Sequence, residues 1–61
     1  MNIQVGDLMK YFDGVNEYIC IIAAKDGHFF IVNWLHNERY YFHVRLHFND
    51  IQPTFGWSKL S

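Results

Sequence analysis

The sequence has few of the features that cross-link a small fold or direct it into a membrane. Its one cysteine, Cys20, excludes an internal disulfide and a cysteine-rich zinc site, and it is typical of a reducing compartment. No stretch approaches the ~20 apolar residues of a membrane-spanning helix, and the first residues lack a basic region followed by an apolar run. We therefore expect a cytoplasmic protein that is neither secreted nor inserted into a membrane.

Positive charge is also scarce. The chain carries five lysine and arginine residues against six acidic residues, which gives a net charge of -1. The cations are Lys10, Lys25, Arg39, Arg45 and Lys59. They are scattered, whereas strong binding to a phosphate backbone needs clustered cations. Single-stranded nucleic acid is therefore a less favoured partner. It would bind through bases stacked on aromatic side chains, with His43 and Arg45 near the phosphates.

Groups that catalyse reactions are equally sparse. The serine and threonine hydroxyls all lie near the C-terminus, and Cys20 falls among isoleucines, where a thiol is usually a buried apolar side chain. Histidines are present, but His43 and His47 on one strand would lie ~13 Å apart, which is too far to share a zinc ion. The carboxylates mostly occupy predicted turns. We expect no enzymatic activity, no metal and no cofactor.

Aromatic and β-branched residues are abundant instead. Aromatic residues make up 20% of the chain, and glycine or proline separates them into short runs that are typical of strands. We expect five strands, at residues 8–12, 18–24, 28–35, 39–46 and 51–55. Asp26-Gly27 is a hairpin signal, and Pro53 would confine the last strand to a sheet edge. The pattern predicts an all-β, five-stranded, strongly bent antiparallel barrel over residues 1–55, followed by a short tail at residues 56–61.

Alternation gives the second and third of these strands two apolar faces, because side chains two residues apart share a face of a sheet. The inward-facing set that we predict comprises Tyr18, Cys20, Ile22, Phe30, Val32, Trp34, Tyr40, Phe42 and Val44. The outward-facing set forms an apolar patch of Ile19, Ile21, Phe29, Ile31 and Tyr41, flanked by His43 and Arg45. Such a patch usually marks an interaction surface; the alternative is that the tail or the loop near Phe48 folds over it.

Four short motifs resemble, in their order and spacing, those of a Tudor-type, SH3-like barrel. They are Val5-Gly6-Asp7, Asp13-Gly14 leading to Tyr18-Ile19-Cys20-Ile21-Ile22, Ile31-Val32-Asn33-Trp34 with Asn37-Glu38, and Asp50-Ile51-Gln52-Pro53. The likeness covers about residues 5–53 and implies an SH3-like fold. Tudor domains bind methylated lysine or arginine in an aromatic cage, which the resemblance assigns to Phe12, Tyr18 and Trp34, with Asn37 as the polar member.

Two binding functions are favoured over the binding of single-stranded nucleic acid. Our leading hypothesis is a non-catalytic protein-binding module that self-associates, or binds another protein, through the outward-facing patch. Small solitary modules of this kind resemble bacteriophage or mobile-element proteins that inhibit a host factor. The alternative is a small aromatic or nucleotide-like ligand, bound in a pocket of Tyr18, Trp34, His36 and Tyr40.

Overall fold

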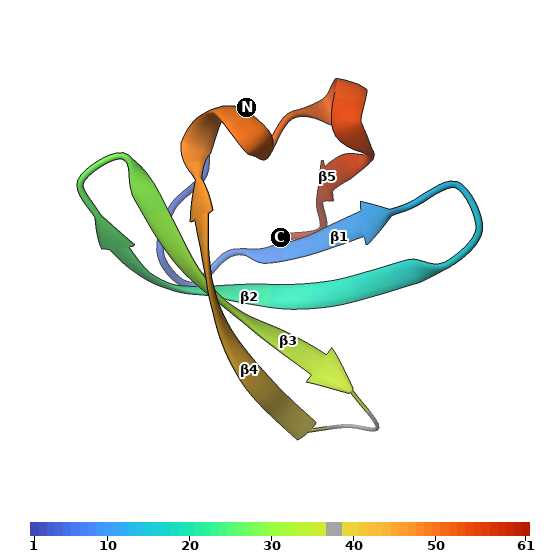
Figure 1. Ribbon diagram of the computed structural model, residues 1–61, viewed down its shortest axis with the longest axis horizontal. Helices are drawn as coiled ribbons and strands as arrows, with labels where there is room; N and C mark the ends of the chain where they lie inside the picture. The colour runs from blue at the N-terminus through green and yellow to red at the C-terminus, as the bar shows by residue number, and fades with distance from the viewer. Residues whose placement is uncertain (37–38) are drawn as a thin grey trace.

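The computed structural model describes the backbone of residues 1–36 and 39–61 and the side chains of residues 1–35 and 44–61. Its strands are β1 (Leu8–Phe12), β2 (Glu17–Asp26), β3 (Phe29–His36), β4 (Arg39–His47) and β5 (Trp57–Lys59). Two short 3-10 helices, η1 (Phe48–Asp50) and η2 (Pro53–Phe55), connect β4 to β5 (Figure 1). Neither these helices nor any other described segment forms a helix long and apolar enough to cross a bilayer.

All five strands form one antiparallel sheet in the order β4-β3-β2-β1-β5. The register between β2 and β3 shifts at Ala23, between Ile22 and Ala24, and a bulge of this kind bends and twists a strand. Figure 1 shows β3 and β4 turning away from β1 and β5. The expected all-β class with five antiparallel strands is confirmed. The sheet does not close, and β4 and β5 form its two edges.

The first four strands lie where the sequence predicts them, within two residues at each end, but the fifth strand predicted at residues 51–55 is wrong. Pro53 begins η2 instead, since proline fits the first position of a helical turn, where no amide hydrogen bond is needed. Gly56 ends that turn with a φ of 98°, and the chain then returns as β5 beside β1. The fifth strand therefore lies within the segment that was predicted to be a tail.

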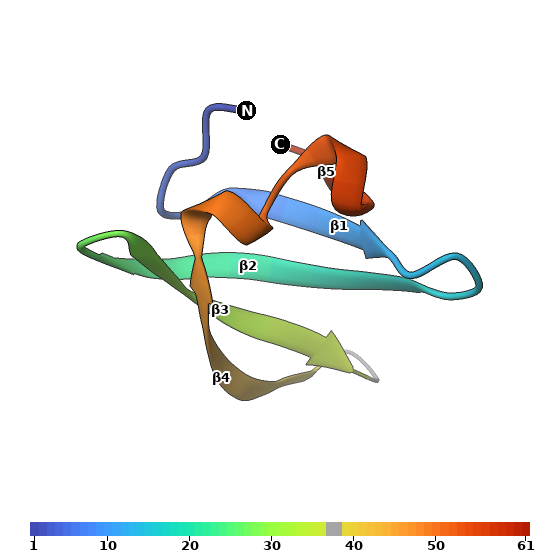
Figure 2. The same ribbon diagram turned by 45° about the horizontal axis from the view of Figure 1, so that its top comes forward.

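The core lies on one face of the sheet, which we call the inner face. Its buried side chains are Met9, Cys20, Ile22, Phe30, Val32, Ile51 and Trp57. The four from β2 and β3 belong to the set predicted to face inward, and Trp34 and Val44 pack against them, so the alternation is confirmed at these positions. Ile51 and Trp57 come from the segment after β4. That segment therefore packs on the inner face, as Figure 2 shows.

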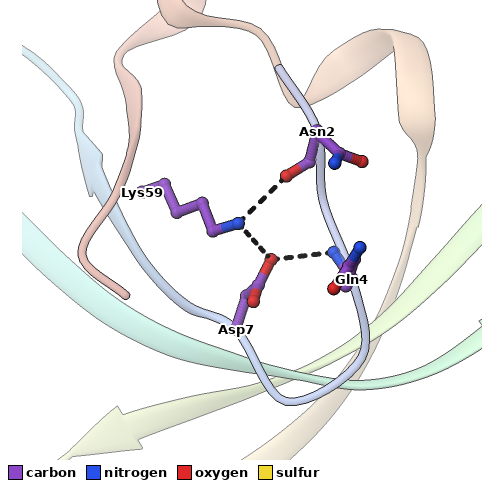
Figure 3. Close-up of polar contacts among 4 residues, drawn as sticks. All are labelled: Asn2, Gln4, Asp7 and Lys59. Carbon is purple, nitrogen blue, oxygen red and sulfur yellow. Dashed lines mark hydrogen bonds and ion pairs between the residues drawn. The ribbon is translucent and has the colours of Figure 1, made fainter.

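The N-terminal segment is held on the same side of the sheet by a polar clamp, drawn in Figure 3. Asp7 Oδ2 accepts a hydrogen bond from the Gln4 amide at 2.8 Å and lies 3.1 Å from Lys59 Nζ. The same ammonium group donates to the Asn2 carbonyl at 3.2 Å. Because Lys59 belongs to β5, the clamp ties the first residues of the chain to its last strand.

Candidate functional site

The outer face of the sheet is apolar along the middle of β2 and β3. It consists of Ile19, Ile21, Phe29, Ile31, Asn33 and Leu35, which are all half-buried. The register places them side by side, since Ile19 opposes Leu35 and Ile21 opposes Asn33. Ile51 and Trp57 pack on the inner face, so the alternative that the tail or the loop near Phe48 folds over the outer face is wrong.

Each end of the outer face carries an ion pair. Lys10 Nζ lies 3.6 Å from Glu17 Oε1 at one end, and Arg45 Nη2 lies 3.5 Å from Asp26 Oδ2 at the other. The Arg45 guanidinium also stacks over the Phe29 ring, 4.0 Å from the ring centre. Glu17, Arg45 and Asp26 are exposed and Lys10 is half-buried, so both ion pairs add little to the stability of the chain itself. The side chains of Tyr41 and His43, also predicted for this surface, lie outside the described residues.

A second site, the aromatic cleft, lies on the inner side of the sheet. It is a hollow of about 240 Å³ lined by Tyr11, Trp34, Leu46, Asp50, Phe55 and Trp57. The Trp57 ring packs against Tyr11 and Trp34, with ring centres 5.0 and 5.7 Å apart. Tyr18 extends the cluster by packing edge-to-face on Trp34 at 6.1 Å. Mutual packing of this kind fixes the orientation of the rings and presents flat apolar walls beside a carboxylate.

The structure brings together two of the six residues predicted to contact a ligand, Tyr18 and Trp34. Phe12 follows Tyr11 along β1, so strand alternation directs its side chain to the opposite side of the sheet, where it is 45% exposed. The side chains of His36 and Tyr40, and the whole of Asn37, lie outside the described residues.

Three aromatic residues of the cleft escape prediction from the sequence: Tyr11, Phe55 and Trp57. The position of Tyr11 could have been predicted, because Tyr11 opposes Tyr18 across the β1–β2 turn and the two side chains therefore share a face of the sheet. No comparable signal exists for Phe55 and Trp57. Their position depends on η2 and on the left-handed conformation of Gly56, which together reverse the chain and bring β5 back to β1.

Cys20 is fully buried, as predicted, and burial raises the pKa of its thiol to about 11. At neutral pH it is therefore a protonated apolar side chain and not a nucleophile. Within residues 1–35 and 44–61, no three histidine, cysteine or acidic side chains are grouped so that they could hold a metal ion. His47 has a local role, because its Nδ1 accepts a hydrogen bond from the Asn49 amide at 3.1 Å and caps η1.

Two carboxylates are held in their charged form by backbone amides. The hydrogen bond from the Gln4 amide lowers the pKa of Asp7, and Lys59 lowers it further. The pKa of Asp13 is lowered by the amides of Asn16 and Val15, at 2.7 and 2.8 Å. Both carboxylates fix turns at the ends of β1, so their contribution is structural.

Comparison of the chain with protein-family models, with curated proteins and with solved structures finds no match. The outer face offers apolar area with charges at both ends, and the aromatic cleft offers ring faces beside a carboxylate.

Proposed function

We propose that this chain is a non-catalytic protein-binding module whose outer face docks on the outer face of a second copy. The observation that carries the proposal is the row of half-buried apolar side chains on that face, over which no described segment packs. A contiguous apolar patch is typical of an interaction site, because contact with a partner removes apolar area from water. Two sheets that meet face to face bury such a row between them.

The distribution of charge favours a second copy as the partner. The register pair Ile21–Asn33 lies halfway along the face. Glu17 lies four residues before Ile21 on β2, and Phe29 lies four residues before Asn33 on β3; because the strands are antiparallel, these two residues mark opposite ends of the face. A two-fold axis that crosses the strands at this pair would lay one end of the face over the other end of its copy. Because this axis stacks β2 on β2, Glu17 would lie over Asp26 of the second copy. The Lys10–Glu17 pair of each copy would then meet the Asp26–Arg45 pair of the other, so two cations and two carboxylates would gather at each end.

Asn33 supplies a polar group at the centre of this contact. Its Oδ1 is buried and accepts no hydrogen bond from a described residue. Among the described residues no donor offsets the cost of burying this acceptor, about 1–3 kcal/mol, so a donor from a second copy would stabilise the contact. On the two-fold axis the two Asn33 side chains would face each other, and each carboxamide has both donors and an acceptor, so a side-chain rotation lets them pair. A central polar pair of this kind would fix the register of two apolar faces.

Sedimentation velocity over a wide range of protein concentration tests the proposal. We expect the wild type to dimerise, and Ile21→Lys to be a folded monomer, because the substitution places an ammonium group at the centre of the apolar contact. Val15→Lys is the matched control, since Val15 is 83% exposed in the β1–β2 turn, outside the apolar row. Circular dichroism verifies that both variants fold. A dimer that survives Ile21→Lys, or a wild type that is monomeric at every concentration, overturns the proposal.

The fold proposal that accompanies this function is a Tudor-type, SH3-like barrel. The strand order β4-β3-β2-β1-β5, the bulge in the long β2 and the helical turns before β5 support it. The methyl-lysine cage that the resemblance implies has less support, because Phe12 is directed away from Tyr18 and Trp34. A methylated partner is therefore not part of the proposed function.

The aromatic cleft supports a second candidate function, the binding of a planar ligand between ring faces. Among the described residues that line it, Asp50 alone is charged, and its carboxylate would repel a phosphate. A nucleoside therefore fits the cleft better than the nucleotide-like ligand expected from the sequence. Titration with adenosine should change the tryptophan fluorescence, with weaker binding in Phe55→Ala and unchanged binding in Phe12→Ala. Tighter binding of AMP than of adenosine would contradict this candidate.

A further inference from the structure

A separate cavity of about 300 Å³ lies between the β2–β3 hairpin, η1 and the N-terminal segment. Its apolar lining comes from Met1, Ile3, Phe30, Phe48 and Ile51, and its polar lining includes Lys25 and His28. Phe30 and Ile51 are buried core residues, so the cavity reaches the core from the inner side of the sheet. It is therefore distinct from the outer face, and it shares no lining residue with the aromatic cleft. Its volume is at the lower end of the range for small-molecule sites.

Lys25 lines this cavity because of the bulge in β2. Ile22 opposes Val32, but after the extra residue Ala23 the register continues with Ala24 opposite Ile31 and Lys25 opposite Phe30. Lys25 therefore shares the inner face with Phe30, whereas an unbroken alternation from Ile22 would place it on the outer face. Bulges are often found where a strand has to re-aim a side chain.

Lys25 is the one lysine, arginine or acidic residue in the described lining of the cavity. That lining contains no carboxylate side chain, and its other polar side chains belong to Asn2, His28 and Gln52. Among the described residues, Lys25 has no carboxylate within ion-pair distance, whereas Lys10, Arg45 and Lys59 each have one. The ammonium group of Lys25 is thus free to meet a ligand at the edge of an apolar hollow.

We propose that this cavity binds a small organic anion, with an apolar or aromatic body against Phe30, Phe48 and Ile51 and a carboxylate or phosphate group at Lys25. An ammonium group beside an apolar wall binds such a ligand through a charge-assisted hydrogen bond and through removal of apolar area from water. The wall formed by Asn2 and Ile3 is already in place, because Lys59 holds the Asn2 carbonyl at 3.2 Å and is itself held by Asp7. This site goes beyond the proposed function, which uses the opposite side of the sheet.

Titrations followed by NMR on isotopically labelled wild-type protein test this site with matched probes. Phenylacetate carries the charge and the ring, phenylacetamide carries the ring alone, and phenyl phosphate replaces the carboxylate by a phosphate group. We expect both anions to shift the resonances of Lys25, His28 and Phe48, and the amide to bind at least about tenfold more weakly. The tighter of the two anions identifies the head group that the site prefers.

Two lysine variants complete the test. Lys25→Met keeps the length of the side chain and removes its charge, and we expect phenylacetate to bind it at least about tenfold more weakly than it binds the wild type. Lys10→Met is the matched control, because it removes one charge from the outer face and should leave the affinity unchanged. Equal affinities for phenylacetate and phenylacetamide, an unchanged affinity in Lys25→Met, shifts confined to other residues, or no shifts at all would each overturn the proposal.

Discussion

The Phe12 amide donates a hydrogen bond to the Gly56 carbonyl at 2.9 Å, and this bond joins the end of β1 to the turn that starts β5. Gly56 has a φ of 98°, a conformation that residues with a side chain rarely adopt. A Cβ atom on Gly56 would also collide with the Phe12 carbonyl oxygen. Both the backbone conformation and the close approach therefore require glycine at this position.

Gly56→Ala should therefore destabilise the protein by about 2 kcal/mol or more, since it combines backbone strain with a backbone clash. Gly14→Ala is the matched control, because Gly14 has a similar φ of 102° but a Cβ atom added there would meet no other atom within 4 Å. Urea denaturation of the two variants measures the difference. Equal losses of stability in the two variants would show that the clash with the Phe12 carbonyl adds nothing to the cost of Gly56→Ala.

The clamp at Asp7 should make stability depend on pH. The pKa of Asp7 is lowered in the folded chain, first by the Gln4 amide and then by Lys59. Its contribution is therefore present above the ordinary value of 3.8 and is lost as pH falls through the folded pKa. Asp7→Asn should be less stable than the wild type at neutral pH, and the difference should disappear in acid. Thermal unfolding across this pH range gives the result, and a difference that persists at low pH would count against the clamp.

The thiol of Cys20 should resist modification in the folded protein. Its pKa is raised to about 11 and its side chain is fully buried, so neither the thiolate nor access for a reagent is available at pH 8. We expect a disulfide reagent to react slowly with the native protein and rapidly in concentrated urea. Fast stoichiometric reaction under native conditions would mean that the core around Cys20 opens readily.

Much of the sheet could be predicted from the sequence because its local signals agree with one another. The Asp26-Gly27 hairpin and the alternation of Cys20, Ile22, Phe30 and Val32 point to the same strands and the same inner face. The fifth strand could not be placed in this way. Residues 51–55 have the composition of a strand. Pro53 and Gly56 instead form a turn, and the stability of this turn depends on β1, more than forty positions earlier in the chain.

The candidate sites also differ in how far local sequence signals place their residues. Ile19, Ile21, Phe29 and Ile31 are found on the outer face as predicted, because their position follows from alternation within a hairpin. The lining of the cavity beside Lys25 could not be foreseen, because one extra residue at Ala23 reverses the alternation that follows. Bulges leave little local signal in a strand of apolar residues, since each of the neighbouring side chains suits either face.

In the proposed dimer the outer faces of two copies meet across a two-fold axis, with the Lys10–Glu17 pair of one copy at the Asp26–Arg45 pair of the other. The most direct test is sedimentation velocity of Glu17→Lys, of Arg45→Glu and of their equimolar mixture. Each variant alone should dimerise more weakly than the wild type, because like charges then meet at both ends of the contact. In the mixture opposite charges meet at both ends, so the heterodimer should form. Variants that dimerise as the wild type does, or a mixture that stays monomeric, would contradict the proposed dimer.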